Sequence, residues 1–354
     1  MTAAFDESDV FTAGQEGVSR YRIPALLVSP GGLLLAFCEA RKISLHDASP
    51  TDLVLRRSLD NGATWLPLQR ILCGVGAEAI MNPCPFVDGK TTWLFCMNAH
   101  KTERGHHRQL VLHSGDDGRS WSAPADITDM LGDDTFIPGP GVGIRLRNGK
   151  WIVPGYTAVF APDKTRLATY SRVAISGDQG RTWHLGEPVA YAMSNESQVV
   201  ERADGSLLLN WRIQKKTDSP GCRGTAVSLD QGETWSGPVP DPALNEAPCQ
   251  AGFISCRAPG VGDKAPLLFS NNDVGGELGM DRKKMTVRLS YDDGRTWPVS
   301  RLVHAGPSAY SCPALLPDGR VGLLYECGET SCYDVIRCAR FSFDWINPVG
   351  RNWF

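Results

Sequence analysis

The eight residues SLDNGATW at 58–65 decide the fold, because four near copies of them follow along the chain. The copies share the pattern Ser-x-Asp-x-Gly-x-(Ser/Thr)-Trp and read SGDDGRSW at 114–121, SGDQGRTW at 176–183, SLDQGETW at 228–235 and SYDDGRTW at 290–297. Their first residues lie 56, 62, 52 and 62 positions apart. A motif that returns at such a period indicates a protein built from repeated supersecondary units.

Each copy, called a box below, has the residue types of a β-hairpin turn. An aspartate bonds its own backbone, a glycine adopts the positive φ of tight turns, and the hydroxyl groups bond nearby amides. The tryptophan that ends each box is expected to anchor the turn by packing between strands. The box aspartates are therefore interpreted as structural residues and not as catalytic acids.

The segments around the boxes predict β-strands. In the fourth unit, three short runs rich in apolar and β-branched residues precede the box, with turn residues between them: ESQVVER at 196–202, SLLLNWR at 206–212 and RGTAVS at 223–228. A mean repeat of about 58 residues fits roughly six times into the 354 residues. The last unit carries only SFDW at 342–345 where a box is expected, which is either a degenerate copy or chance.

These observations predict an all-β fold, a six-bladed β-propeller with four-stranded antiparallel blades. Radial closure of six such units hides the strand edges that an open sheet would expose. The whole chain, residues 1–354, is then predicted to form a single domain.

Composition excludes several classes of partner. A net charge of −3 and a pI of about 6.2, with only short basic runs, argue against nucleic acid as a ligand. No stretch approaches the roughly 18 apolar residues of a membrane span, and the start, MTAAFDESDV, lacks the features of a signal peptide.

The cysteines give an expectation about location. There are eleven, they are scattered, and no two have the CxxC spacing of a metal or redox site. We interpret them as reduced core residues and predict a cytoplasmic protein, with a trimmed secreted protein as the alternative. No metal and no cofactor are predicted, and the oligomeric state is not determined by the sequence.

Polar residues gather at one predicted end of the propeller channel. In an up-and-down blade, that end holds the starts of first strands, the ends of second strands and the loops after them. The first-strand starts supply Arg22, Met81, Asn82, Glu196, Gln250 and Tyr310. The second-strand ends and following loops supply Glu39, Arg41, Asp47, Tyr156, Arg212, Arg282 and Glu326. Because the boxes lie at the opposite end, this convergence of charged side chains predicts a functional site.

The motifs YRIP at 21–24, FCEAR at 37–41 and MNPCP at 81–85, together with the five boxes, resemble the sialidase superfamily. The likeness is strongest to the compact cytosolic-type sialidases of animals and covers essentially the whole chain. It implies an exo-α-sialidase that hydrolyses a terminal α-linked sialic acid from a glycan with retention of configuration. The expected ligand is a sialylated glycan or glycoconjugate.

The resemblance assigns Arg22, Arg212 and Arg282 to a triad that binds the substrate carboxylate, with Arg288 close to Arg282 in sequence. Guanidinium groups bind a carboxylate with fork-like hydrogen bonds that lysine does not reproduce. The same carboxylate would repel an anionic nucleophile, and sialidases differ from most glycosidases in using a tyrosine as the nucleophile. The resemblance thus makes Tyr310 the nucleophile and Glu196 the base that removes its proton.

Asp47 matches the general acid/base of the family, although Asp52 lies nearby in the sequence. The remaining matches bind or orient the substrate. Glu326 is expected to orient Arg22, and Glu39 is grouped with the substrate-binding residues. Arg41 and Asn82 are expected to reach the 4-hydroxyl or N-acyl group beside an apolar wall at Met81, with Tyr156 and Gln250 on the glycerol side. A second tyrosine usual in the family is replaced by Ala158.

The sequence leaves alternatives open. A hydrolase of a related 2-keto sugar acid, Kdn or Kdo, and a trans-sialidase would need the same carboxylate clamp. A propeller that binds a glycan without cutting it is the non-enzymatic alternative, although the candidate acid, base and nucleophile are all present. Linkage preference is not determined.

Overall fold

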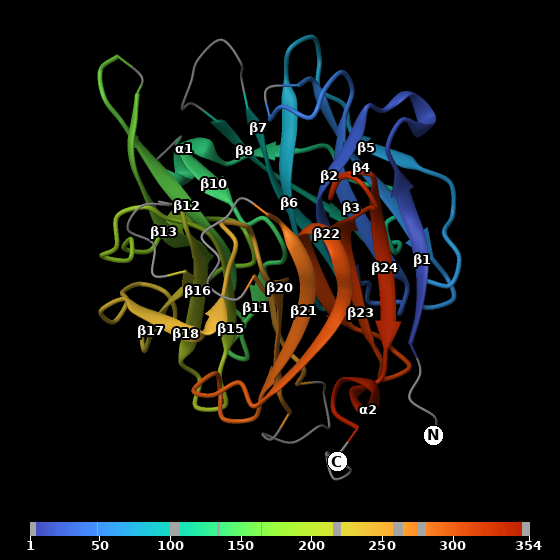
Figure 1. Ribbon diagram of the computed structural model, residues 1–354. Coiled ribbons are helices and arrows are strands. Elements are labelled where there is room, and N and C mark those ends of the chain that lie inside the picture. Colours follow the sequence, from blue (N-terminus) through green and yellow to red (C-terminus); the bar gives the residue numbers. More distant parts are fainter. Residues whose placement is uncertain are drawn as a thin grey trace.

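The computed structural model describes residues 5–47, 49–99, 107–132, 135–163, 165–214, 221–257, 265–274 and 281–348, and within them it is almost entirely β-structure (Figure 1). The strands form antiparallel blades arranged as a ring. The predicted all-β propeller is confirmed.

The first three blades follow the chain in order. Blade one contains β2 (Arg20–Val28), β3 (Leu34–Arg41), β4 (Thr51–Ser58) and β5 (Gln69–Leu72). Blade two contains β6 (Ala79–Asp88), β7 (Thr91–Ala99), β8 (His107–Ser114) and β9 (Ala125–Asp126), and the short helix α1 (Thr128–Leu131) follows it. Blade three begins with two short strands that share a partner and contains β10 (Phe136–Pro138), β11 (Ile144–Arg145), β12 (Trp151–Phe160), β13 (Arg166–Ser176) and β14 (His184–Leu185).

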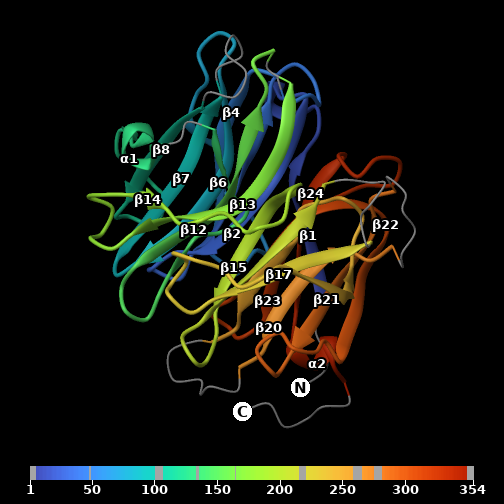
Figure 2. The same cartoon turned by 90° about the vertical axis from the view of Figure 1, so that its left-hand side faces the viewer.

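Blades four and five come next, and the last strand of blade five continues into blade six. Blade four contains β15 (Ser194–Glu201), β16 (Leu207–Ile213), β17 (Cys222–Ser228) and β18 (Val239–Asn245). Blade five contains β19 (Gly252–Ser255), β20 (Leu267–Asn272), β21 (Lys283–Ser290) and the first part of β22 (Val299–Leu315). Figure 2 shows blades three and four side by side, with β12 and β13 next to β15.

The sixth blade is completed by the N-terminal strand. It begins with the second part of β22 and contains β23 (Val321–Cys327), β24 (Val335–Phe341) and β1 (Phe5–Thr12), which is followed by the 3₁₀ turn η1 (Gln15–Gly17). β1 pairs with β24 from Phe5↔Phe341 to Thr12↔Val335, and the two lie together in Figure 1. The first and last strands of the chain therefore close the ring, a pairing that the box pattern did not reveal.

The SFDW segment is not a sixth box. Residues Phe343–Ile346 form the short helix α2, and Ser342 caps it by accepting a hydrogen bond from the backbone N–H of Trp345. A box turn is unnecessary here because β1 already supplies the outer strand of blade six.

Closure by β1 predicts a large stability cost when its buried aromatic residue is removed. Phe11 is 1% exposed and lies 5.2 Å from the ring of Tyr21, centroid to centroid. We expect Phe11→Ala to lower the free energy of unfolding by about 3–5 kcal/mol in urea denaturation. Phe5→Ala is the matched control, because Phe5 lies on the same strand at 36% exposure and should lose far less. Equal losses would show that β1 does not belong to the cooperative core.

The boxes form the predicted turns, and each connects the third and fourth strands of its blade. In the second box, the Asp116 carboxylate accepts from the Ser114 hydroxyl, the Ser120 hydroxyl and the Ser120 N–H at 2.8, 2.6 and 2.9 Å. Asp117 and Gly118 both have positive φ, as the corresponding residues of the other boxes do. The hydrogen bonds from Ser120 lower the pKa of Asp116 to about 2, so this turn keeps its charge at neutral pH.

Two further sequence expectations can be compared with the described residues. All eleven cysteines are unpaired, and nine of them are buried. Within the described ranges, no helix has the length and apolar character needed to span a membrane.

Candidate active site

The inner strands of the blades are irregular where the candidate residues lie. Register shifts interrupt β2 between Arg22 and Ala25, β6 between Met81 and Cys84, β15 between Ser194 and Ser197, and β22 between Ser308 and Ser311. Bulges of this kind redirect side chains and are common beside active sites. They place Arg22, Asn82, Glu196 and Tyr310 at the same end of their blades, opposite the boxes.

Two buried carboxylates accept hydrogen bonds from three of these irregular strands. Glu326, which is 0% exposed, accepts the N–H of Ile23 at 2.8 Å with one oxygen and the N–H of Tyr310 at 3.2 Å with the other. Glu39, also 0% exposed, accepts the N–H of Asn82 at 3.0 Å. Backbone groups that a bulge removes from the sheet are thus satisfied by second-strand side chains.

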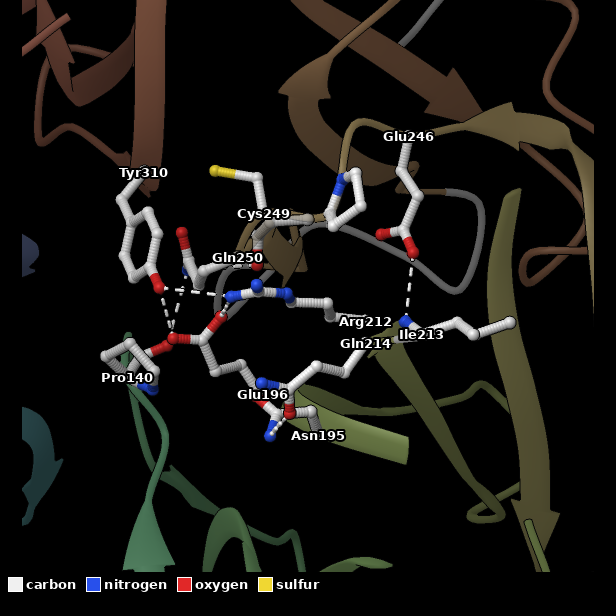
Figure 3. Close-up of polar contacts among 12 residues, drawn as sticks. Pro140, Asn195, Glu196, Arg212, Ile213, Gln214, Glu246, Cys249, Gln250 and Tyr310 are labelled. Atoms are coloured by element: carbon white, nitrogen blue, oxygen red, sulfur yellow. Dashed lines mark hydrogen bonds and ion pairs between the residues drawn. The ribbon is translucent and has the colours of Figure 1, made fainter. Parts of the chain in front are cut away.

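Tyr310, Glu196 and Arg212 form a hydrogen-bonded group (Figure 3). The Tyr310 hydroxyl donates to Glu196 Oε1, while Arg212 Nη1 donates to Glu196 Oε2 at 2.8 Å and approaches the Tyr310 oxygen at 3.4 Å. Burial, and then the negative charge of Glu196, raise the pKa of Tyr310 well above its ordinary value. Tyr310 is therefore a neutral phenol whose proton already points at a carboxylate.

Arg22 also lies against the ring of Tyr310. Its Nε donates to Glu326 at 2.7 Å, and its guanidinium carbon lies 5.2 Å from the centre of the Tyr310 ring. Burial by itself lowers the pKa of Arg22, but the negative charge of Glu326 more than offsets that effect and raises the pKa above its ordinary value. The cation is therefore retained although only 6% of the residue is exposed. Such a buried cation is prepared to meet an anionic ligand.

Arg282 completes the cluster, and Tyr333 joins it to Arg22. The guanidinium carbon of Arg282 lies 5.4 Å from the centre of the Tyr310 ring, and its Nη1 donates to the Tyr333 hydroxyl at 3.0 Å. The Tyr333 ring lies under Arg22 at 4.2 Å. Sequence analysis missed Tyr333, although it lies in a loop between second and third strands, which the strand order places at this end.

Arg288 is not part of this cluster. It lies inside β21, where it donates to Asn271 at 2.9 Å and pairs with Asp273 at 2.6 Å. The three arginines that the sequence analysis grouped thus converge on one phenol, and the neighbouring Arg288 has structural partners.

Asp47 lies in the loop after β3 and is held by Arg41. Arg41 Nη1 pairs with Asp47 at 2.8 Å and Arg41 Nη2 pairs with Glu39 at 2.8 Å, while the Asp47 side chain is 83% exposed. Asp52 is different, because it is 2% exposed and bonded to Lys42 at 2.7 Å and to the N–H of Gly74 at 3.0 Å. Of the two aspartates, only Asp47 has a carboxylate accessible to a ligand.

Asn82, Met81, Tyr156 and Gln250 are the remaining residues that the sequence analysis expected to contact the substrate. Asn82 bonds the carbonyl of Pro138 at 3.0 Å, Met81 packs in a small apolar cluster with Met97, and Tyr156 is half-buried within the electrostatic reach of Glu196. Gln250 is 1% exposed, and its amide bonds backbone groups that include both the N–H and the carbonyl of Ser311 at 3.0 and 3.1 Å. The structure therefore places Gln250 beneath the site, where it supports the strand that carries Tyr310.

The described part of the chain contains no group of three or more His, Cys, Asp or Glu residues arranged to hold a metal ion.

Comparison with known proteins identifies the family. Residues 32–323 match the family model of the BNR repeat-like domain. The chain is 35% identical to a sialidase of Micromonospora viridifaciens over 98% of its own length and 55% of that protein, so it spans little more than half of that relative. It is 32% identical to Sialidase-3 of Mus musculus, covering 93% of this chain and 92% of the relative.

A solved structure shows the same architecture. The Hadza microbial sialidase Hz136 superposes with a TM-score of 0.84 at 29% identity, covering 96% of this chain and 69% of that one. The motifs, the matched repeat family and the mammalian relative, which is covered over nearly its full length, all indicate the same family. The chain belongs to the sialidase superfamily.

Proposed function

We propose that this protein is a retaining exo-α-sialidase that hydrolyses terminal α-linked sialic acids of glycoconjugates with Tyr310 as its nucleophile. The observation that carries the proposal is the hydrogen bond from the Tyr310 hydroxyl to Glu196 inside a cluster of three arginines. The relatives named above are sialidases and support the same activity.

The arginines select the substrate by its charge. A sialic acid carries a carboxylate on its anomeric carbon, and Arg22, Arg212 and Arg282 together present several N–H donors around one point. A carboxylate nucleophile would be repelled by that substrate anion, whereas the neutral phenol of Tyr310 is not. The cluster thus binds the acid and brings its anomeric carbon to Tyr310.

The first chemical step forms a glycosyl–enzyme bond. The Tyr310 oxygen attacks the anomeric carbon while its proton passes to Glu196, which already accepts the hydrogen bond. Asp47 gives a proton to the glycosidic oxygen, so the aglycone leaves as a neutral alcohol. Arg212 lies against both Glu196 and the phenol oxygen and balances their charge as the proton moves.

The second step releases the sugar with its original configuration. Asp47, now ionised, takes a proton from a water molecule that attacks the same anomeric carbon, and the Tyr310 oxygen leaves and recovers its proton from Glu196. Two displacements at one carbon give net retention. The exposure of Asp47 beside Arg41 suits a group that must meet both the aglycone and water.

A substrate panel tests this function against its alternatives. We expect the protein to release 4-methylumbelliferone from the 2-α-glycoside of Neu5Ac with EDTA present, and ¹H NMR to detect the α-anomer as the first product. Glycosides of Neu5Gc, Kdn and Kdo measured in parallel identify the preferred sugar acid. Faster release from the Kdn or Kdo glycoside would make that sugar acid, and not sialic acid, the substrate. A β-anomer as first product would exclude a retaining mechanism. Binding without turnover would indicate a glycan-binding propeller.

A further inference from the structure

A buried ion pair lies behind the candidate site and has no role in the chemistry described above. Glu246 follows β18, Arg223 lies in β17, and their side chains are 2% and 1% exposed. Glu246 Oε2 pairs with Arg223 Nη1 at 2.7 Å, and Arg223 Nε donates to Asn210 at 2.7 Å. Both charges are therefore held by specific partners inside blade four.

The pair is bonded directly to the end of β16. The backbone N–H of Ile213 donates to Glu246 Oε1 at 2.9 Å, and Figure 3 shows the Glu246 carboxylate facing that nitrogen. Ile213 is the residue after Arg212, whose guanidinium lies on Glu196 and Tyr310. The position from which Arg212 extends into the site is thus fixed by a bond to a buried carboxylate.

The same pair also fixes the segment 246–250. Arg223 Nη1 donates to the carbonyl of Cys249 at 2.8 Å. The preceding carbonyl, that of Pro248, accepts from Arg282 Nη2 at 2.9 Å, so this segment orients a second arginine of the clamp. Gln250, at its end, bonds Ser311 beside Tyr310.

The cost of burying the charges of Glu246 and Arg223 indicates that the pair serves to hold neighbouring backbone groups in place and not to stabilise the fold. Burial raises the pKa of Glu246 to about 7 although the neighbouring Arg223 opposes that shift, which shows how strongly the site disfavours its charge. Apolar residues of similar volume often replace a buried ion pair without loss of stability. What they cannot supply is an acceptor for Ile213 and a donor for Cys249.

We propose that Glu246 and Arg223 are positioning residues that set the spacing of Arg212 and Arg282, and so determine how well the site discriminates a carboxylate from its neutral ester. This inference rests on the proposed function, because it assumes that the arginines bind the carboxylate of a sugar acid. Neither residue touches the substrate, and both act through the backbone of neighbouring residues.

The test is the affinity ratio between 2,3-didehydro-2-deoxy sialic acid and its methyl ester, measured by titration calorimetry. In Glu246→Gln, the amide keeps an acceptor for Ile213 but turns an NH₂ group toward Arg223, where donor meets donor. We expect this variant to lose about tenfold or more of the acid-to-ester ratio, since small displacements of binding groups have effects of this size. KM for the sialoside should rise in parallel.

Asp293→Asn is the matched control. Asp293 belongs to the fifth box, at the opposite end of the blades, and pairs with Arg257 at 2.6 Å with side chains 22% and 18% exposed. The substitution therefore removes one carboxylate charge from an arginine pair that lies away from the site. This control should keep both the ratio and KM of the wild type. A loss of folded protein alone would lower the apparent kcat and leave KM unchanged, so the two readouts separate positioning from general stability.

A second variant keeps the proposal testable if Glu246→Gln does not fold. Arg223→Met combined with Glu246→Leu removes both buried charges together, so no unpaired charge remains in the core. It also removes the hydrogen bonds to Ile213 and Cys249. We expect the same loss of ratio. If either variant folds and keeps an acid-to-ester affinity ratio within twofold of the wild type, the proposal is overturned. The titration needs no turnover, so a wild type that binds the acid but cleaves nothing contradicts the proposed function and leaves this inference separately measurable.

Discussion

Replacing Tyr310 by phenylalanine is expected to lower kcat by about a thousandfold or more while the protein remains folded. Removal of an enzyme's nucleophile commonly costs several orders of magnitude, and a thousandfold corresponds to about 4 kcal/mol of barrier. The phenylalanine ring keeps the packing against Arg22 and Arg282. Only the hydroxyl that donates to Glu196 is lost, and Glu196 keeps its pair with Arg212. Single-turnover kinetics with the 4-methylumbelliferyl sialoside measure the effect.

Tyr325→Phe provides a close control for that experiment. Tyr325 is 0% exposed, and its hydroxyl donates to the Glu7 carboxylate at 2.7 Å in blade six. The substitution therefore removes the same hydroxyl-to-carboxylate bond in a place without a proposed chemical role. We expect normal kcat for Tyr325→Phe. A Tyr310→Phe variant that kept more than a tenth of the wild-type kcat would exclude Tyr310 as the nucleophile.

Replacing Arg22 by methionine is expected to weaken binding of a sugar-acid inhibitor by about a hundredfold, or about 2.7 kcal/mol. Methionine keeps the apolar stem but cannot donate to a carboxylate. The methyl ester of the same inhibitor should lose much less affinity, because it lacks the charge that the guanidinium binds. Calorimetric titration of both compounds measures the difference.

Two further variants make the Arg22 result interpretable. Arg22→Met leaves the buried Glu326 carboxylate without its cation, a situation that costs about 3–5 kcal/mol of stability. Combining it with Glu326→Gln removes that charge and should recover part of the lost stability without restoring affinity for the acid. Recovery is partial because the amide oxygen can accept only one of the N–H groups of Ile23 and Tyr310. Arg20→Met, two residues earlier on β2, should change neither property, because Arg20 bonds only the carbonyl of Ser19 among the described contacts. Unchanged affinity in Arg22→Met would remove Arg22 from the clamp.

The boxes and the strands around them could be read from the sequence because they are local. A box needs only its own eight residues: Ser114 and Asp116 bond within the turn, and the positive φ values fall at Asp117 and Gly118. Local hydrogen bonds and backbone preferences are visible in a short window of sequence. The order of strands then placed Arg22, Glu196 and Tyr310 at one end of the blades without any coordinates.

The features that sequence analysis missed depend on contacts between distant residues. The pairing of β1 with β24 joins the two ends of the chain, and the SFDW segment consequently forms a helix where a box was considered. Tyr333 is an ordinary loop tyrosine in the sequence, and only the fold brings it between Arg22 and Arg282. The sequence analysis had already assigned Asp47 and not Asp52, and the structure adds only that the Asp47 side chain is 83% exposed while that of Asp52 is 3% exposed.

By itself, the sequence determined the repeat, the propeller and the end of the channel at which polar residues gather, because periodicity and strand order fix direction along each blade. Only the tertiary structure decided which of those residues meet. The hydrogen bond from Tyr310 to Glu196 spans 114 residues of sequence, and the bond from Arg22 to Glu326 spans 304. Their geometry is set by the bulges and buried carboxylates that close one blade against the next, since side-chain contacts depend on packing between blades and not on the order of residues within one.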